Sequence, residues 1–345
     1  MNQDKKGLFS KIFFFAVITI ALIILLFSLN DINEIVEVLK DVNWLWLLVG
    51  IGFLLLYIIL NPISLYLLSK KQNESVGFGK TLMIGTIEYF FNGITPFSSG
   101  GQPFQVLAYN KVGVKPHKST GILLMNFVVF QLTVVLLCIV SMFYIDKLAA
   151  SDSYLYVLII AGFLINFVIL VFLIAIGVSN NVRRFLVFLI TKIFKMRIFK
   201  GKLDNKIKVF EGYCDGVQAT FKGLLSHKWT FVICLILKAM AFIFYYMIPF
   251  FILKALNIEI GIDSLVLVTA MTIFAIAMTC YFPTPGAAGG IEFAFQALFI
   301  NITASASAVA VSGVLLWRFI TYYLLMAISL ITYIIFNKMK TSEVL

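Results

Sequence analysis

The chain has 345 residues, of which 61% are hydrophobic and 12% are charged, and its formal net charge is +11. A water-soluble fold could not cover so much apolar surface, and apolar segments long enough to cross a bilayer recur along the chain. Because no basic domain is interleaved with aromatic residues, the charge does not indicate nucleic-acid binding. We read the lysines and arginines instead as signals of membrane topology. The composition predicts an all-α, polytopic integral membrane protein.

Cysteine and histidine provide no sign of a metal centre, a disulfide framework or a Cys/His catalytic arrangement. The cysteines are scattered and include no C-x-x-C motif, and both histidines lie at the edges of predicted spans. We therefore expect no metal, no cofactor and no catalytic residue. These six residues are Cys138, Cys214, Cys234, Cys280, His117 and His227.

The amino-terminal region predicts a retained membrane span. Three lysines within the first eleven residues precede an unbroken apolar run over residues 12–29. This run is longer than a signal-peptide core and ends without a small-x-small cleavage site, so it is predicted to stay in the protein with its amino end in the cytoplasm. Residues 31–43 alternate apolar and acidic positions, which predicts a short amphipathic helix at the outer interface.

Charge between the later spans sets their orientation. Residues 179–228 contain eleven basic and three acidic residues, which places this stretch in the cytoplasm as helices resting on anionic lipid. The last span ends near two further lysines, so the carboxyl terminus is also predicted to be cytoplasmic. The predicted spans after the first are residues 44–69, 120–144, 154–178, 230–253 and 304–336.

One motif, T-P-x-x-x-G-G, occurs twice and predicts broken helices inside the membrane. Thr284 starts the second copy 189 positions after Thr95, and Phe104 and Phe293 keep the same offset. Proline removes a backbone donor and glycine permits positive φ. Since a membrane tolerates irregular backbone only against protein or water, we expect the copies to face each other across a cavity. The predicted substrate-binding residues of the motifs are Thr95, Pro96, Gly100, Gly101, Thr284, Pro285, Gly289 and Gly290.

The flanks of the motifs predict two inverted repeats within a single domain, residues 1–345. Basic residues flank the first copy on both sides, whereas no basic residue follows the second, so the two would be re-entrant segments from opposite faces. Repeat one covers about residues 44–144 and repeat two about residues 230–336, joined by a span and the basic loop. Inverted repeats with broken helices are typical of alternating-access transporters.

Four ionisable residues fall at membrane depth, where charge is costly: Glu88, Lys238, Glu292 and Arg318. One interpretation is that they neutralise one another. The other is that the two cations hold a phosphate-bearing headgroup while a carboxylate balances a cationic group on it. Arginine suits phosphate better than lysine does, and helix amino ends exposed at the breaks would add donors to the same anion.

The two segments GITPFSSGGQPFQVLAY and YFPTPGAAGGIEFAFQ, together with the pattern of spans, resemble the transmembrane region of lysylphosphatidylglycerol synthases, the multiple peptide resistance factor family. The resemblance implies a flippase that moves aminoacylated phosphatidylglycerol to the outer leaflet and blunts cationic antimicrobial peptides. In that family a separate soluble domain transfers lysine from charged tRNA. Since this chain stops at Leu345, we do not expect that domain in it.

Three functions stay open from the sequence. The first is a lipid flippase in a bacterial cell membrane, carrying an anionic or aminoacylated phospholipid or a glycolipid. The second is an enzyme, phosphatidylglycerol lysyltransferase, which the family name suggests. The third is an accessory membrane subunit that anchors a lipid-modifying enzyme. The predicted partners are the lipid substrate, a separate synthase and a second copy of the chain, with no nucleic acid.

Overall fold

The structure is a computed structural model, and the predicted first span over residues 12–29 lies outside the part of the chain that it describes. It describes residues 32–72, 74, 76–149, 153–197, 203–279, 282–303 and 307–339. These residues are helical or lie in short connections, without a strand among them. The prediction of an all-α protein is confirmed.

The first half of the described chain follows the predicted order of span, broken helix and span. A short amphipathic helix precedes it, as expected for residues 31–43. Its elements are α2 (Ile32–Lys40), α3 (Trp44–Lys71), α4 (Phe78–Gly93), η1 (Pro96–Ser98), α5 (Gly101–Lys111), α6 (Pro116–Ser141), η2 (Met142–Tyr144) and α7 (Ile145–Ala149).

The second half repeats this order after one span and two amphipathic helices. Its last long helix contains a π-helical segment, η4, directly after Arg318. Its elements are α8 (Ser153–Val178), α9 (Asn180–Arg197), α10 (Leu203–Leu225), α11 (Lys228–Ala255), α12 (Ser264–Thr279), η3 (Pro285–Ala287), α13 (Gly290–Thr303), α14 (Ser307–Arg318), η4 (Phe319–Leu324) and α15 (Leu325–Lys338).

Within the described residues, five helices are long and apolar enough to cross a membrane. Each carries few charges over at least eighteen residues, and each coincides with a predicted span to within a few residues. The protein is therefore a multi-pass membrane protein. The five helices are Trp44–Lys71, Pro116–Lys147, Tyr154–Val178, Lys228–Ala255 and Ala308–Lys338.

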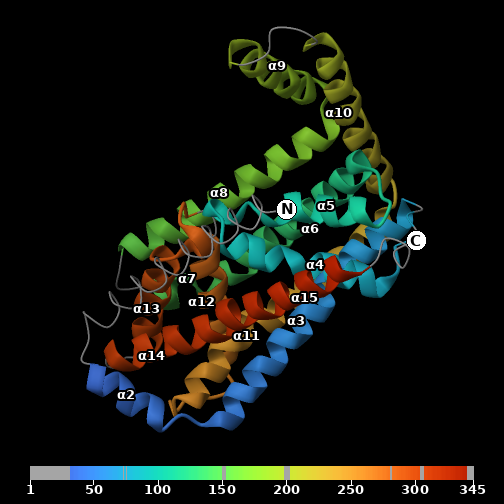
Figure 1. The fold of residues 1–345 in the computed structure, drawn as a ribbon. Coiled ribbons are helices and arrows are strands. Elements are labelled where there is room, and N and C mark those ends of the chain that lie inside the picture. Colours follow the sequence, from blue (N-terminus) through green and yellow to red (C-terminus); the bar gives the residue numbers. More distant parts are fainter. Residues whose placement is uncertain are drawn as a thin grey trace.

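Helices α3 and α11 pack against each other along their length as an antiparallel pair (Figure 1). The amide of Asn43, before α3, donates to the carbonyl of Ala255, the last residue of α11, at 2.8 Å. This contact defines one end of the bundle, called here the Trp44 end. The opposite end, where α3 finishes and α11 starts, is called the Lys71 end.

The helices around the first motif start and finish at the Lys71 end. The ring of Phe78, which starts α4, lies 5.5 Å from the ring of Tyr66 near the end of α3. Lys111, which ends α5, donates to the carbonyl of Phe336 near the end of α15 at 3.0 Å. The segment α4–η1–α5 is therefore a hairpin whose tip points toward the Trp44 end.

The helices around the second motif have the opposite placement. Helix α12 follows the end of α11 after a connection of eight residues, and α13 contacts α7 beyond the far end of α6. Lys118, near the start of α6, pairs with Glu74 at the Lys71 end, so α6 finishes at the Trp44 end. The hairpin α12–η3–α13 thus starts and finishes at the Trp44 end.

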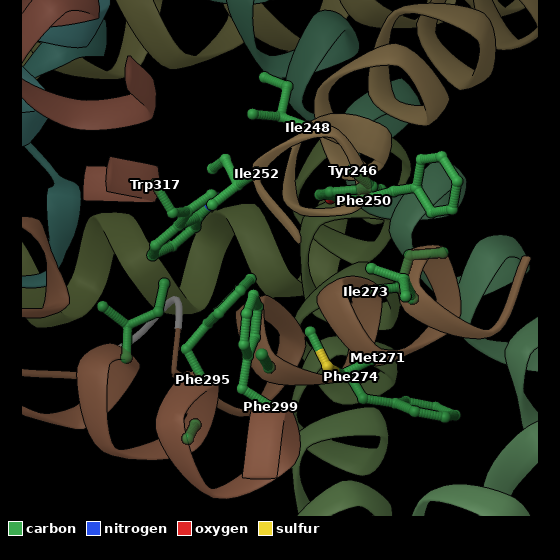
Figure 2. Packing of buried hydrophobic residues seen from close by; sticks show 14 of the residues in the cluster. Tyr246, Ile248, Phe250, Ile252, Met271, Ile273, Phe274, Phe295, Phe299 and Trp317 are labelled. Atoms are coloured by element: carbon green, nitrogen blue, oxygen red, sulfur yellow. The ribbon is translucent and has the colours of Figure 1, made fainter. Parts of the chain in front are cut away.

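Aromatic side chains pack the second hairpin against the last long helix. The rings of Phe295 in α13 and Trp317 in α14 are stacked with their centroids 4.1 Å apart. Figure 2 shows this pair in the same buried group as Phe299, Phe274 and Ile252. The second hairpin is therefore held against the last long helix by ring contacts, which fixes the position of the motif between them.

Candidate functional site

The first motif breaks its helix with two left-handed residues. Thr95 is extended, Pro96 opens a short 3₁₀ turn, and Phe97 and Ser98 have φ values of 56° and 49°. The hydroxyl oxygen of Thr95 accepts a hydrogen bond from the amide of Gly100 at 2.8 Å. This side chain closes the turn, which explains why threonine precedes the break.

The second motif has the same backbone at the same offset. Gly286 and Ala287 have φ values of 60° and 56°, and they stand 189 positions after Phe97 and Ser98. Glycine adopts this conformation freely, whereas each other residue pays roughly 1–2 kcal/mol. Since three of the four left-handed positions are not glycine, the surrounding structure imposes this conformation on both copies.

The backbone amides of three glycines in the two motifs already donate hydrogen bonds to side chains of the protein. The Gly101 amide donates to Asn92 Oδ1 at 2.8 Å, and the Gly289 amide donates to Glu292 Oε2 at 2.7 Å. With Gly100 bound to Thr95, these three groups are engaged at the helix starts. The expectation that the exposed helix amino ends add donors for a bound anion is therefore wrong for these amides.

A cavity of about 560 Å³ lies between the two breaks. The three variable positions of the first motif and two of the three in the second line it, while the threonine, proline and paired glycine positions lie outside the lining. The lining motif residues are Phe97, Ser98, Ser99, Gly286 and Ala287. The two copies thus face one cavity, and the turns η1 and η3 contact each other.

Lys238 projects from α11 into this cavity with only 2% of its surface exposed. Its ammonium donates to Asn61 Oδ1 at 2.8 Å and to the Asn61 carbonyl at 3.2 Å. The Asn61 amide in turn donates to the hydroxyl of Tyr89 at 2.6 Å. A buried cation is therefore held in place by a neutral side chain that links α3, α4 and α11.

Arg318 reaches the second break and is paired there. Its Nε donates to Glu292 Oε1 at 2.7 Å, and its Nη2 donates to the Gly286 carbonyl at 3.1 Å. Both members of the ion pair are 7% exposed. Glu292 thereby joins the amide of Gly289 to the guanidinium, so this pair is part of the structure of the break as well as of the cavity wall.

Glu88 lines the cavity on the side of the first hairpin. It interacts electrostatically with Lys238 across the cavity, yet among the described residues it has no ion pair within 4 Å. Glu88 also has a side-chain hydrogen bond with Gln105, so its known partners are this amide and the more distant Lys238, whereas Glu292 forms an ion pair with Arg318.

Aromatic rings complete the wall between the charges. Tyr57 lies with its ring centroid 4.7 Å from that of Tyr245 and 5.6 Å from that of Tyr89. The guanidinium of Arg318 stands 4.7 Å from the centroid of Tyr322. These rings present both apolar faces and hydroxyl groups, which suits a ligand with a polar head and an apolar body.

The structure separates the predicted site residues into two groups. Glu88, Lys238 and Arg318 line the cavity, whereas Glu292 and the eight motif residues named from the sequence stand behind the lining. Sequence reasoning missed the amide side chains that line the cavity from spans and from the first hairpin, although polar residues in apolar segments are a signal of functional positions. These missed residues include Asn61, Asn92, Gln102, Asn126 and Asn166.

The part of the chain that the structure describes contains no group of three or more His, Cys, Asp and Glu residues able to hold a metal ion. The polar groups that line the cavity are hydroxyls, amides and three ionisable side chains, those of Glu88, Lys238 and Arg318. Such groups can bind and orient a polar headgroup.

Comparison with known proteins agrees with these features. Residues 12–329 match the family described as "Lysylphosphatidylglycerol synthase TM region". The chain is 23% identical over 329 residues to "Uncharacterized protein MG306" of Mycoplasma genitalium, covering 89% of this chain and 83% of that protein. It is 25% identical over 326 residues to "UPF0104 membrane protein" of Archaeoglobus fulgidus, covering 89% and 91% of the two chains.

The match covers both motifs, every residue that lines the cavity and the described spans as far as residue 329 of the last one. The chain therefore belongs to the family of lysylphosphatidylglycerol synthase transmembrane regions.

Proposed function

We propose that this protein is a lipid flippase that moves an anionic or aminoacylated phospholipid, such as lysylphosphatidylglycerol, or a glycolipid between the leaflets of the cell membrane. The observation that carries the proposal is the cavity of about 560 Å³ between two helix breaks of matching backbone. It holds charges at a depth where a membrane protein otherwise avoids them. A headgroup crossing the bilayer needs such a polar site.

The arrangement of helices supports an inverted repeat. Helix α3 is the first span of repeat one and α11 is the first span of repeat two, and the two helices run antiparallel. Helix α4 packs on α15, and its counterpart α12 packs on α6. Each hairpin therefore rests on the last span of the other half, from opposite ends of the bundle. Two halves related in this way can exchange conformations, which would open the cavity to each side in turn.

The charges suggest how a headgroup is held. Lys238 and Arg318 offer donors to a phosphate, and the arginine fork suits phosphate oxygens. Glu88 lines the same cavity and has no ion pair within 4 Å among the described residues, so it can face an ammonium group or hydroxyls on the same head. The aromatic lining suits the apolar part of the lipid next to the head.

Orientation follows from the basic residues at the Lys71 end. We place that end in the cytoplasm by the positive-inside rule, because Lys70, Lys71, Lys111 and the basic helices α9 and α10 gather there. Flipping from this side outward would add aminoacylated lipid to the outer leaflet and reduce its negative charge. Resistance to cationic antimicrobial peptides is the expected consequence.

Transport by the purified chain in liposomes tests the proposal. Lysylphosphatidylglycerol, phosphatidylglycerol and a glycolipid are each placed in the inner leaflet, and their arrival outside is followed with a membrane-impermeant amine reagent or a lipid-specific quencher. We expect movement of at least one lipid above the rate of protein-free liposomes. Movement of none would reject the flippase, and lysine transfer from charged tRNA by the same preparation would favour the enzyme.

A further inference from the structure

Helix α9 exposes an apolar stripe that nothing in the described protein covers. Phe185 and Phe188 are 59% and 60% exposed, and Leu189 is 37% exposed. Exposed Arg184 and Lys192 flank this group along the same side of the helix. The ammonium of Lys192 lies 6.0 Å from the centroid of the Phe188 ring. We call these five residues the α9 stripe.

The other side of α9 is attached to the protein. Val187 is buried, and Arg183 forms an ion pair with Asp215 of α10. Gln218 of α10 donates to the carbonyl of Ser179, directly before α9, at 3.1 Å. Contacts to the protein therefore hold one side of the helix and leave the stripe facing outward.

The stripe lies at the Lys71 end, beyond the spans. Gln72, after α3, donates to the carbonyl of Thr220 in α10 at 3.4 Å, which places α10 at that end. Figure 1 shows α10 crossing the ends of the spans, with α9 folding back beside it and away from the bundle. A helix beyond the ends of the spans is where the surface of a surrounding bilayer is expected.

We infer that the α9 stripe docks on the anionic lipid surface of the leaflet at the Lys71 end. Two phenylalanines and a leucine in one stripe are unfavourable in water, whereas an interface takes up such side chains while neighbouring cations reach the headgroups. Residues 179–228 carry eleven basic and three acidic residues, which complements an anionic leaflet. This inference does not depend on lipid transport.

Helix α10 connects α9 to a helix that lines the cavity. The hydroxyls of Thr120 in α6 and Tyr213 in α10 lie 2.6 Å apart, and a Cβ on Gly121 would meet the side chain of Thr220 at 2.6 Å. Helix α6 also lines the cavity through Leu123. Helix α10, to which α9 is attached, therefore packs closely on a helix that lines the cavity.

Hydrogen–deuterium exchange of the full chain in nanodiscs tests the inference. Peptides over residues 181–192 are compared in phosphatidylcholine alone and in phosphatidylcholine with phosphatidylglycerol. Two cations near an anionic surface each contribute roughly fivefold, so we expect exchange about 25-fold slower in the anionic nanodiscs. High salt should remove most of the difference.

Two variants separate the charged and apolar contributions. R184E/K192E should lose the dependence on phosphatidylglycerol, and F185S/F188S should exchange faster in both lipids. K40E/K147E carries the same charge change at the Trp44 end and should keep the dependence. Unchanged exchange of α3 and α11 peptides confirms that each variant is folded.

Three results would overturn the inference. Equal exchange in the two lipids would show that anionic lipid does not hold the stripe. Protection in R184E/K192E equal to that of the original protein would exclude the cations. Protection that rises with protein concentration in detergent would assign the stripe to a second copy of the chain.

Discussion

The ammonium of Lys238 on α11 is bound by two oxygens of a single residue, Asn61 on α3. Both acceptors are neutral, so Asn61 positions the amino group of Lys238 at the cavity wall without forming an ion pair with it. The antiparallel packing of α3 on α11 brings the two residues together although 177 positions separate them in the chain.

Replacing Lys238 by methionine tests whether this charge binds the headgroup. Methionine keeps the length and the apolar stem, so we expect the fold to persist and transport to fall by about 10–100-fold, which is the usual worth of a hydrogen bond to a charged group. Flipping in liposomes is the measurement. Lys228→Met changes an exposed position of the same helix and should transport lipid at the normal rate. An equal loss of transport in both variants would contradict a role for Lys238 in binding the headgroup.

The pair of Arg318 and Glu292 contributes to stability as well as to the site. Removing one member leaves the other charge buried, so Arg318→Ala or Glu292→Ala should each lower the free energy of unfolding by about 3–5 kcal/mol. The double replacement R318M/E292M should recover most of this loss without restoring transport. Thermal unfolding in detergent, measured beside flipping, separates the two effects, and a double variant that transports lipid would show that the pair is purely structural.

A side chain on Gly286 should distort the second break. A Cβ there would overlap the ring of Tyr322, and the φ of 60° disfavours residues other than glycine. We expect Gly286→Ala to cost about 1–3 kcal/mol of stability and to slow transport. Gly52→Ala is the matched control, because nothing lies within 4 Å of its Cβ, and a gain of about 0.5–1 kcal/mol is expected there. Similar melting temperatures for the two variants would contradict the proposed constraint.

Cysteine labelling from either side of the membrane tests the inverted repeat. In a background without the native cysteines, Lys115→Cys should react only with reagent in the cytoplasm and Ile262→Cys only with reagent outside. Both positions are exposed. Lys115 follows the first hairpin, and Ile262 precedes the second. Labelling of both from one side would contradict an inverted arrangement of the two halves.

The sequence alone determined the helical membrane fold and the positions of most spans. Runs such as residues 154–178 are apolar on all sides. A single segment of this kind must form a helix to cross a bilayer, because its backbone groups can find hydrogen-bond partners only within the segment. The two breaks were equally visible, since proline and paired glycine act locally on φ and on backbone donors. Whether the basic stretch docks on lipid stays a prediction.

Only the tertiary structure decided which residues face the cavity. The motif suggested its threonine, proline and glycine positions, but these form the frame of the turn, while Phe97 and Gly286 reach the lining. Likewise, four isolated charges in the sequence could pair in several ways. The packing of α14 on the second break joined Arg318 to Glu292 and left Glu88 facing Lys238, because pairing depends on distances in space that local sequence does not encode.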